Sequence, residues 1–256
     1  MSRKKQADQN PFLPVSKADM EARGWDWYDF LIVNGDAYVD HPSFGGVVIA
    51  RTLEAEGYRV AFLPQPDWHS ADAFLAMGKP RLAVMLSSGN LDSMVAHYTA
   101  AKKRRRQDAY SPGYQTGLRP DRAVIVYANR VREAFSDTPL IIGGLEASLR
   151  RFAHYDYWSN QVRRAILFDA RADLLIYGMG EAATLEIAAQ LNAGVPVSDI
   201  TTVRGTSFAA REREACVYPW VEVPSYEEVK ADKVAYAEAN QVEYEEHDPV
   251  RGKAIL

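Results

Sequence analysis

The sequence has few of the residues that build disulfides, cysteine-rich metal sites or membrane spans. Cys216 is the only cysteine in 256 residues, which excludes an internal disulfide, a cysteine-rich zinc site and an all-cysteine iron–sulfur site within this chain. No apolar run approaches the about 18–20 residues that cross a bilayer. The basic start at Met1 leads into polar residues, which is not the pattern of a secretory signal. We therefore expect a cytoplasmic protein with no membrane partner.

Charge and composition narrow the classes further. A formal net charge of −4 argues against a strongly basic face, so we do not expect nucleic acid as a partner. The basic run at 102–106 has no interleaved aromatic residue, which is more typical of a solvated loop. Cys216 has no evident activating neighbour, and we expect it to be structural or inert.

Short apolar runs alternate with helical patterns along most of the chain. Buried strands are expected at 28–33, 58–63, 81–86, 139–142 and 173–177, and helices at 43–57, 70–77, 91–102, 122–135 and 182–191. Because parallel strands need a crossover connection, this order predicts a doubly wound, mostly parallel, Rossmann-like α/β sheet with helices on both faces.

Composition divides the chain into three parts. Residues 1–25 are interpreted as an N-terminal arm and 26–205 as the α/β domain, with an excursion at 103–119. Residues 206–256 differ, because 212–248 holds eleven acids against three bases. We expect an acidic linker there, with an amphipathic helix at 226–245, that leads toward a further domain.

Polar and glycine residues follow the strands, where ligands bind in doubly wound sheets. Carboxylates and a histidine in the first loop suit acid–base chemistry, metal binding or the grip of a ligand's hydroxyls. The alternative is that Asp36 and Asp40 fix the turn while Ser43 caps the next helix. The ligand-binding candidates of these loops are Asp36, Tyr38, Asp40, His41, Ser88, Asn90, Gly143, Gly144, Glu146 and Glu181.

The stretch 178–183 reads Gly-Met-Gly-Glu-Ala-Ala and formally matches G-x-G-x-x-A. A dinucleotide fingerprint belongs in the opening strand–helix–strand unit, whereas this one follows the last expected strand. Glu181 would also face a phosphate with like charge. A glycine turn with an acid at the helix start is the favoured interpretation.

Residues 148–164 combine arginines, a histidine and several large aromatic side chains. Three interpretations stay open: a docking surface for an anionic or planar ligand, an amphipathic helix, and a seam against another domain. The candidates for such a crevice or seam are His154, Tyr155, Asp156 and Trp158.

Several long strings resemble the N-terminal region of the YgiQ family of radical SAM proteins. They include 35–45 (GDAYVDHPSFG), 88–94 (SGNLDSM), 119–122 (RPDR), 143–151 (GGLEASLRR) and 154–159 (HYDYWS). The resemblance covers the chain from about Phe12 onward. It implies a cobalamin-binding-like domain that precedes a radical SAM barrel.

That barrel would carry a C-x-x-x-C-x-x-C motif for a [4Fe-4S] cluster, whose open iron binds S-adenosylmethionine (SAM). The resemblance implies that the intact protein cleaves SAM reductively to a 5′-deoxyadenosyl radical. This chain would be an accessory domain, not catalytic alone, that positions substrate or shields the radical. Its partners would be its own downstream domain and an unknown small-molecule or macromolecular substrate. No such motif occurs in the chain, so no cluster ligand transfers onto it.

Cobalamin domains commonly carry D-x-H-x-x-G after the first strand. In the string at 40–45 the acid directly precedes His41 and the glycine stands one place further on, which counts against a cobalamin ligated by His41. Two alternatives stay open: a free-standing cobalamin- or nucleotide-binding domain, and a non-catalytic interaction module.

Overall fold

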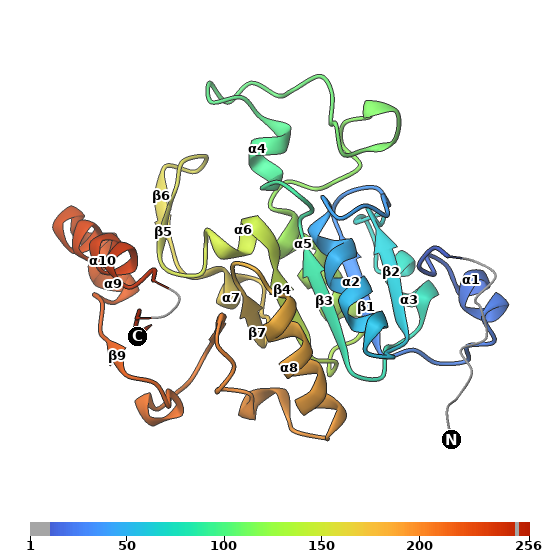
Figure 1. The fold of residues 1–256 in the computed structure, drawn as a ribbon. Coiled ribbons are helices and arrows are strands. Elements are labelled where there is room, and N and C mark those ends of the chain that lie inside the picture. Colours follow the sequence, from blue (N-terminus) through green and yellow to red (C-terminus); the bar gives the residue numbers. More distant parts are fainter. Residues whose placement is uncertain (1–10, 249–250) are drawn as a thin grey trace.

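The centre of the molecule is a six-stranded sheet in the order β2-β1-β3-β4-β7-β8 (Figure 1). The computed structural model describes residues 11–248 and 251–256. The first five strands in that order are parallel, and β8 runs antiparallel to β7. The strands are β1 (Phe30–Asn34), β2 (Val60–Pro64), β3 (Ala83–Ser87), β4 (Leu140–Gly143), β7 (Leu174–Ile176) and β8 (Thr206–Phe208).

Helices cover both faces of this sheet. On one face, α2 (Gly45–Ala55) and α8 (Glu181–Asn192) pack beside each other. The opposite face holds α3 (Asp72–Met77), α5 (Ala123–Ala134) and α7 (Ile166–Asp169). The shorter elements are α1 (Lys17–Ala22), α4 (Ser93–His97), α6 (Gly144–Ser148), β5 (His154–Asp156), β6 (Gln161–Arg163), β9 (Trp220–Val221), α9 (Tyr226–Ala231), α10 (Lys233–Glu245) and β10 (Ala254–Ile255). The predicted doubly wound α/β fold is confirmed.

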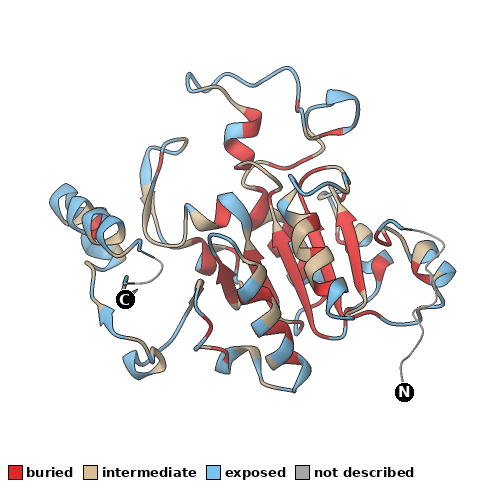
Figure 2. Cartoon of the chain, in the orientation of Figure 1, coloured by how far each residue is buried: buried red, intermediate tan, exposed pale blue. Residues whose placement is uncertain are grey.

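The central strands are apolar because both of their faces are buried. In β1, Leu31 and Val33 belong to the core under α3, α5 and α7, whereas Phe30 and Ile32 belong to the core under α2 and α8. Successive side chains of a strand point to opposite faces, so one run of aliphatic residues supplies both cores. Figure 2 shows the sheet buried and the C-terminal elements α9, α10 and β9 largely exposed.

Three local expectations were wrong. Ser43 does not cap α2, because its N-cap residue is Phe44 and no side-chain cap forms. The expected helix at 91–102 is only α4, since Tyr98 is extended (φ −129°). The helical interpretation of 148–159 fails as well, because after α6 the chain forms the β5–β6 hairpin.

The predicted helix at 226–245 is two helices. Asp232 lies between them in extended conformation, and its carboxylate accepts hydrogen bonds from the backbone N–H groups of Val234 and Ala235. It thereby ends α9 and caps α10. The sheet also includes β8, just past residue 205, where the acidic segment was expected to begin. No helix in the described parts of the chain is both long and apolar enough to cross a membrane.

Candidate functional site

The loops that follow β1 and β3 meet at the carboxyl edge of the sheet. In the sheet, β2 lies on one side of β1 and β3 on the other, so the strand order reverses at β1. The adjacent strands β1 and β3 therefore flank the topological switch point. Asn90 joins the two loops. Its backbone N–H donates to Asp36 Oδ2 (2.7 Å), its Nδ2 donates to Ser43 O (2.8 Å), and its Oδ1 accepts from Gly45 N (3.3 Å).

Asp36 lies in a fully buried ion-pair network below this junction. Arg119 donates from Nη1 to Asp36 Oδ1 (2.6 Å) and to Ser88 O (3.0 Å), and from Nη2 to Asp108 Oδ2 (2.7 Å). Burial raises the pKa of Asp36 to about 6, against the lowering effect of Asn90 N–H and the Arg119 guanidinium. The geometry gives Asp36 a structural role, since it holds the two loops and the excursion together.

Two glycines allow this close packing. A Cβ on Gly35 would lie 2.1 Å from Ser88 O, and one on Gly89 would lie 2.0 Å from Asp36 Oδ1. Gly89 also has φ +103°, which L residues with side chains rarely adopt. Larger residues here would push apart the loops that Asn90 and Asp36 join.

Tyr38 and Asp40 form a separate cluster nearer the N-terminal arm. Tyr38 Oη donates to Asp40 Oδ2 (3.0 Å) and accepts from Leu13 N (2.9 Å), and Arg51 pairs with Asp40. The hydrogen bond from Arg51 lowers the pKa of Asp40. His41 is exposed, and its Nδ1 accepts from Ser43 N (3.1 Å).

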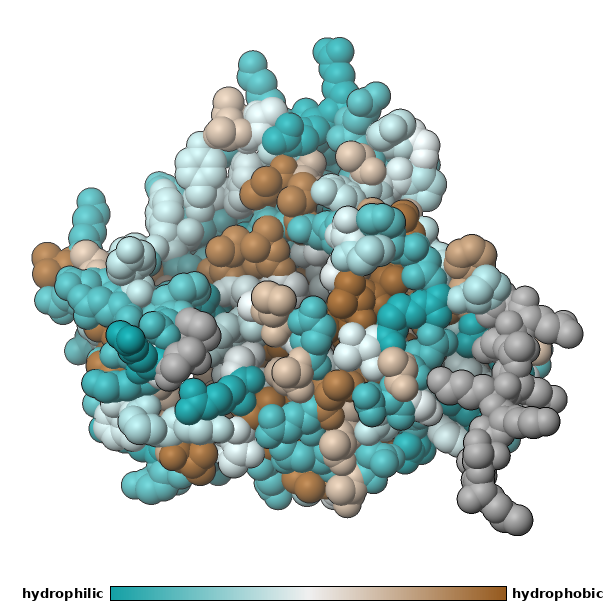
Figure 3. Space-filling model, viewed as in Figure 1, coloured by the Kyte–Doolittle hydropathy of each residue, from teal (hydrophilic) through white to brown (hydrophobic). Residues whose placement is uncertain are grey.

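A cleft of about 350 Å³ opens at the same edge, between the first turns of α2 and α8. Such volumes suit small-molecule sites. Figure 3 shows this face with hydrophobic side chains beside α2 and over α4 and α6. The cleft is lined by Ile32, Pro42, Ser43, Gly45, Gly46, Val48, Ile49, Met85, Leu86, Ser87, Gly89, Ile141, Ile142, Gly143, Gly144, Ile176, Gly178, Met179, Gly180, Glu181 and Thr184.

The structure therefore divides the sequence candidates between different places. Gly143, Gly144 and Glu181 line the cleft together: Gly143 ends β4, Gly144 begins α6, and Glu181 begins α8 after the turn that follows β7. Asp36, Ser88 and Asn90 belong to the loops after β1 and β3, beside the cleft, and are not among its lining residues. They hold these loops in place with their polar atoms, as the bonds above show, and Ser88 Oγ also donates to Leu91 O (2.9 Å).

Glu146 is buried, and its side chain binds the N-terminal ends of two helices. Its carboxylate accepts from Ser93 N (2.8 Å) at the start of α4 and from Val124 N (3.0 Å) in the first turn of α5. Burial raises its pKa, and the neighbouring Asp92 carboxylate adds to that rise. Glu146 thus satisfies N–H groups that have no intrahelical acceptor and fixes α6 against α4 and α5.

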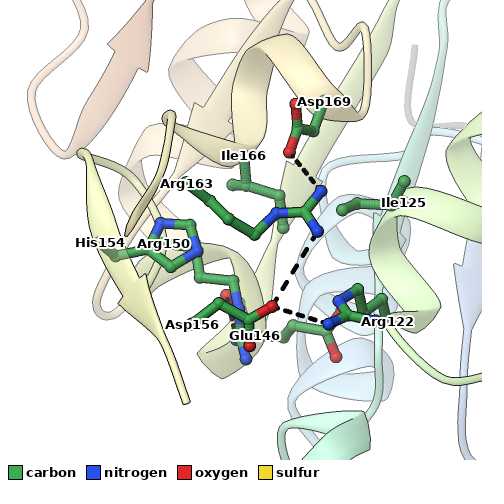
Figure 4. A pocket seen from close by; sticks show the side chains of 9 residues that line it. All are labelled: Arg122, Ile125, Glu146, Arg150, His154, Asp156, Arg163, Ile166 and Asp169. Atoms are coloured by element: carbon green, nitrogen blue, oxygen red, sulfur yellow. Dashed lines mark hydrogen bonds and ion pairs between the residues drawn. The ribbon is translucent and has the colours of Figure 1, made fainter. Parts of the chain in front are cut away.

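The β5–β6 hairpin is fastened by a line of alternating charges (Figure 4). Asp156 pairs with Arg122 (2.7 Å) and lies 4.0 Å from Arg163, which pairs in turn with Asp169 (2.8 Å). Burial alone would raise the pKa of Asp156, but the hydrogen bonds from Ser159 and Arg122 lower it to about 2. The cavity between these side chains has a volume of only about 10 Å³, room for one water.

The other hairpin candidates make uncharged contacts with neighbouring parts of the chain. His154 Nδ1 lies 3.1 Å from Phe152 O, and burial lowers the pKa of His154. Tyr155 N donates to Tyr236 Oη (3.3 Å), which ties the hairpin to α10. Trp158 packs on Tyr98 with ring centroids 5.1 Å apart. These contacts lie within this chain, so a docking surface for a ligand and a seam against another domain both stay predictions.

The residues of this chain do not fit an iron–sulfur cluster. A [4Fe-4S] cluster is held by cysteine thiolates, and the half-buried Cys216 is alone. Within 11–248 and 251–256, no group of three or more His, Cys, Asp or Glu side chains is arranged to hold a metal ion.

Sequence reasoning missed several residues that shape this edge. Arg119 and Asp108 both come from the excursion at 103–119, before α5, and nothing in their spacing predicts a pairing with Asp36. Thr184 lies inside α8, where a threonine reads as an ordinary helix residue. Asn34 and Ser87 were visible as polar ends of apolar strands, and Ser87 Oγ donates to Asn34 Oδ1 (2.9 Å).

Comparisons with known proteins agree over almost the whole chain. The family profile described as "Radical SAM N-terminal" matches residues 12–256. A UPF0313 protein of Clostridium botulinum (strain 657 / Type Ba4) is 54% identical over 245 residues, which cover 96% of this chain and 38% of that protein. A UPF0313 protein of Clostridium perfringens (strain 13 / Type A) is 49% identical over 248 residues, covering 97% and 38%.

Among solved structures, the chain is similar to the radical S-adenosylmethionine methyltransferase TsrM of Kitasatospora setae, which was solved with tryptophan substrate and a SAM analog bound. The TM-score is 0.47 at 18% identity, over 71% of this chain and 28% of that chain. This chain spans about 38% of the length of the UPF0313 relatives it matches. On the profile match and these identities, the chain belongs to the Radical SAM N-terminal family, as the N-terminal domain of a UPF0313 protein.

Proposed function

We propose that this chain is the accessory domain of a radical SAM enzyme and that its carboxyl edge receives the downstream part of the intact protein. One observation carries the proposal. Met179 lines the cleft and is 90% exposed, and Leu145 (44% exposed) and Leu149 (61%) follow the cleft-lining Gly143 and Gly144 along the chain. These three residues are called the rim below.

The rim is placed where a covering domain would act on a ligand. Leu145 and Leu149 belong to α6 or directly follow it, after β4, and Met179 follows β7, so both sides of the rim are strand-end loops. Contiguous exposed apolar surface marks interaction sites in soluble proteins. Because the relatives are about 2.6 times longer than the match, a downstream domain is available to cover it.

The residues of this chain would position the substrate and shield the radical from solvent. The cluster and SAM, bound by the downstream part, would supply the radical chemistry. Here the buried Asp36–Arg119 pair and the Glu146 carboxylate keep the strand-end loops fixed, so that a covered cleft holds a substrate in one place. Once the downstream domain covers the rim, water would be excluded from the cleft mouth, which would protect a reactive intermediate from side reactions.

The test uses the full-length protein and the double variant Leu149→Glu/Met179→Glu. Two carboxylates on the rim would have to be desolvated on docking, so the downstream domain should detach from this edge. We expect backbone amides of 145–149 and 176–181 to take up deuterium several-fold faster. We also expect more SAM to be cleaved to 5′-deoxyadenosine without substrate turnover.

The matched control is Leu75→Glu on α3, which is 52% exposed on the other side of the sheet and should change neither readout. The segment 30–34, in the buried β1, reports whether the domain itself stays folded. If the double variant leaves deuterium uptake at both rim segments unchanged while this segment stays protected, the proposal is wrong.

A further inference from the structure

We infer that the basic run at 102–106, together with Tyr98, Tyr157 and Trp158, forms a surface that binds single-stranded nucleic acid. This set of residues is called the basic–aromatic surface below. The inference goes beyond the proposed function, because it concerns neither the rim nor the cleft. It departs from the expectation drawn from the net charge of −4, since a strand contacts a local surface and not the total charge of the chain.

The fold brings aromatic rings to the basic run, which has none of its own. The loop after α4 extends toward the β5–β6 hairpin (Figure 1), and Tyr157 Oη donates to Ala100 O (2.7 Å). Lys102 Nζ donates to Trp158 O (3.3 Å) and lies 4.5 Å from the ring centroid of Tyr157. The Trp158 ring contacts those of Tyr98 and Tyr157, with centroids 5.1 and 5.4 Å away. Cations and rings distant in sequence therefore share one surface.

Backbone contacts hold the basic run in a defined turn. Tyr98 and Arg104 pair as an antiparallel bridge. Within this bridge, Thr99 N donates to Lys103 O (2.9 Å), which closes the turn. A surface that is already ordered loses less conformational entropy when a ligand binds. The turn thus presents its cations in a fixed arrangement beside the rings of the hairpin.

The cations of the run have no carboxylate partner in the parts of the chain that the structure describes. All five side chains are exposed, and none forms an ion pair with an Asp or Glu there; Arg104 acts on Asp121 only at longer range. The nearby Arg122 and Arg163, in contrast, are paired with carboxylates. Exposed like charges repel one another, and a polyanion relieves this repulsion while its counterions are released.

The rings decide which polyanion fits. Phosphates pair with Lys and Arg, and unpaired bases stack on aromatic side chains, so a single strand uses both parts of the surface. Tyr157 is 48% exposed, which leaves its ring accessible to a base. In a duplex the bases are stacked on one another and would contribute phosphates alone. An acidic peptide would likewise pair with the cations and leave the rings unused.

The experiment measures binding of the full-length protein to a fluorescently labelled single-stranded RNA of about 20 nucleotides, by anisotropy at several salt concentrations. Lys103→Gln/Arg106→Gln removes two exposed cations of the run. It should weaken binding on the order of tenfold and reduce the slope of log K against log salt by about 1.4, the effect of two phosphate contacts.

The ring is tested separately from the charge. Tyr157→Ala should weaken binding about tenfold, the effect of one stacked base, and leave the salt slope unchanged. Tyr157→Phe keeps the ring but loses the hydrogen bond to Ala100, and it should bind like the parent. This pair of variants separates stacking of a base from support of the turn.

Lys17→Gln/Lys79→Gln is the matched control for charge. It makes the same change in net charge in α1 and after α3, which Figure 1 shows at the opposite end of the molecule from the hairpin, and it should bind like the parent. Unlabelled strand should compete better than its duplex form or phosphatidylserine vesicles. The inference is overturned if the strand does not bind, if duplex or vesicles compete equally well, if both charge variants weaken binding alike, or if Tyr157→Ala binds like the parent.

Discussion

Arg119 Nη1 lies 2.6 Å from Asp36 Oδ1, and both side chains are fully buried. Residue 36 follows the first strand and residue 119 precedes α5, so the pair joins segments 83 residues apart. The second nitrogen of the same guanidinium bonds Asp108. One arginine therefore joins the loop after β1 to the excursion at 103–119.

Removal of this arginine should be strongly destabilising. Arg119→Met leaves two carboxylates buried without their cation, and loss of one partner of a buried pair costs about 3–5 kcal/mol. We expect a loss of that size in the free energy of unfolding from urea titrations. Arg213→Met is the comparison, because Arg213 and Glu222 form an exposed pair that is worth less than about 1 kcal/mol. Equal losses in the two variants would contradict the role given to Arg119.

The burial of Asp36 predicts a pH dependence of stability. Its pKa in the folded chain is about 6 against an ordinary 3.8, so between these values the folded state binds more protons than the unfolded state. The contribution of Asp36 is therefore largest below about pH 4 and falls as the pH rises through 6. Measured from pH 4.5 to 6.5, the stability of the parent relative to Asp36→Asn should decline by on the order of 2 kcal/mol. A constant difference would refute the raised pKa.

The lowered pKa of Asp156 predicts a pH dependence of stability opposite in sign to that of Asp36, and at lower pH. Hydrogen bonds from Ser159 and Arg122 outweigh its burial and lower its pKa to about 2, so its contribution is present above pH 4 and is lost as the pH falls through 2. Asp156→Asn should therefore lose less stability than the parent between pH 4 and 2. Thermal unfolding followed by circular dichroism checks this. If both proteins lose the same stability between pH 4 and 2, the lowered pKa of Asp156 is refuted.

Two glycine substitutions can separate the cost of steric contact at Gly89 from the cost of backbone strain. Gly78 also has a positive φ (+78°), but a Cβ there would meet nothing within 4 Å. Gly78→Ala should cost about 1–3 kcal/mol from strain alone, since φ +78° and ψ 170° form a conformation that is essentially restricted to glycine. Gly89→Ala should cost more than about 3 kcal/mol, since the methyl group must also displace the buried Asp36 carboxylate. Chemical denaturation of the two variants gives the difference, and similar losses would show that the loops can move apart.

The fold was largely predictable because the signal is local. The apolar runs around Phe30–Asn34, Val60–Pro64 and Ala83–Ser87 lie between helical patterns, and each became a strand of the parallel sheet. The hairpin at 154–163 was not predictable. Phe152, Tyr155 and Trp158 have helical spacing, but pairing between β5 and β6 and the charges around Asp156 override that periodicity.

The candidate site was predicted only as a location. Strand-end loops must meet at the carboxyl edge of a parallel sheet, so Gly143, Gly144 and Glu181 were placed correctly at one edge. Their neighbours could not be assigned from the sequence. The partners of the Asp36 and Glu146 carboxylates come from residues 22 to 83 positions away, and no pattern marks those contacts.

The sequence by itself determined the order of strands and helices, since hydrophobic periodicity depends on neighbours along the chain. It also determined family membership, through strings such as that at 143–151. Only the tertiary structure decided which polar side chains face each other and which remain without a partner. Those outcomes depend on packing between distant segments, which turned the Asp36 and Glu146 carboxylates into internal supports and left the Thr184 hydroxyl without a partner in the cleft wall.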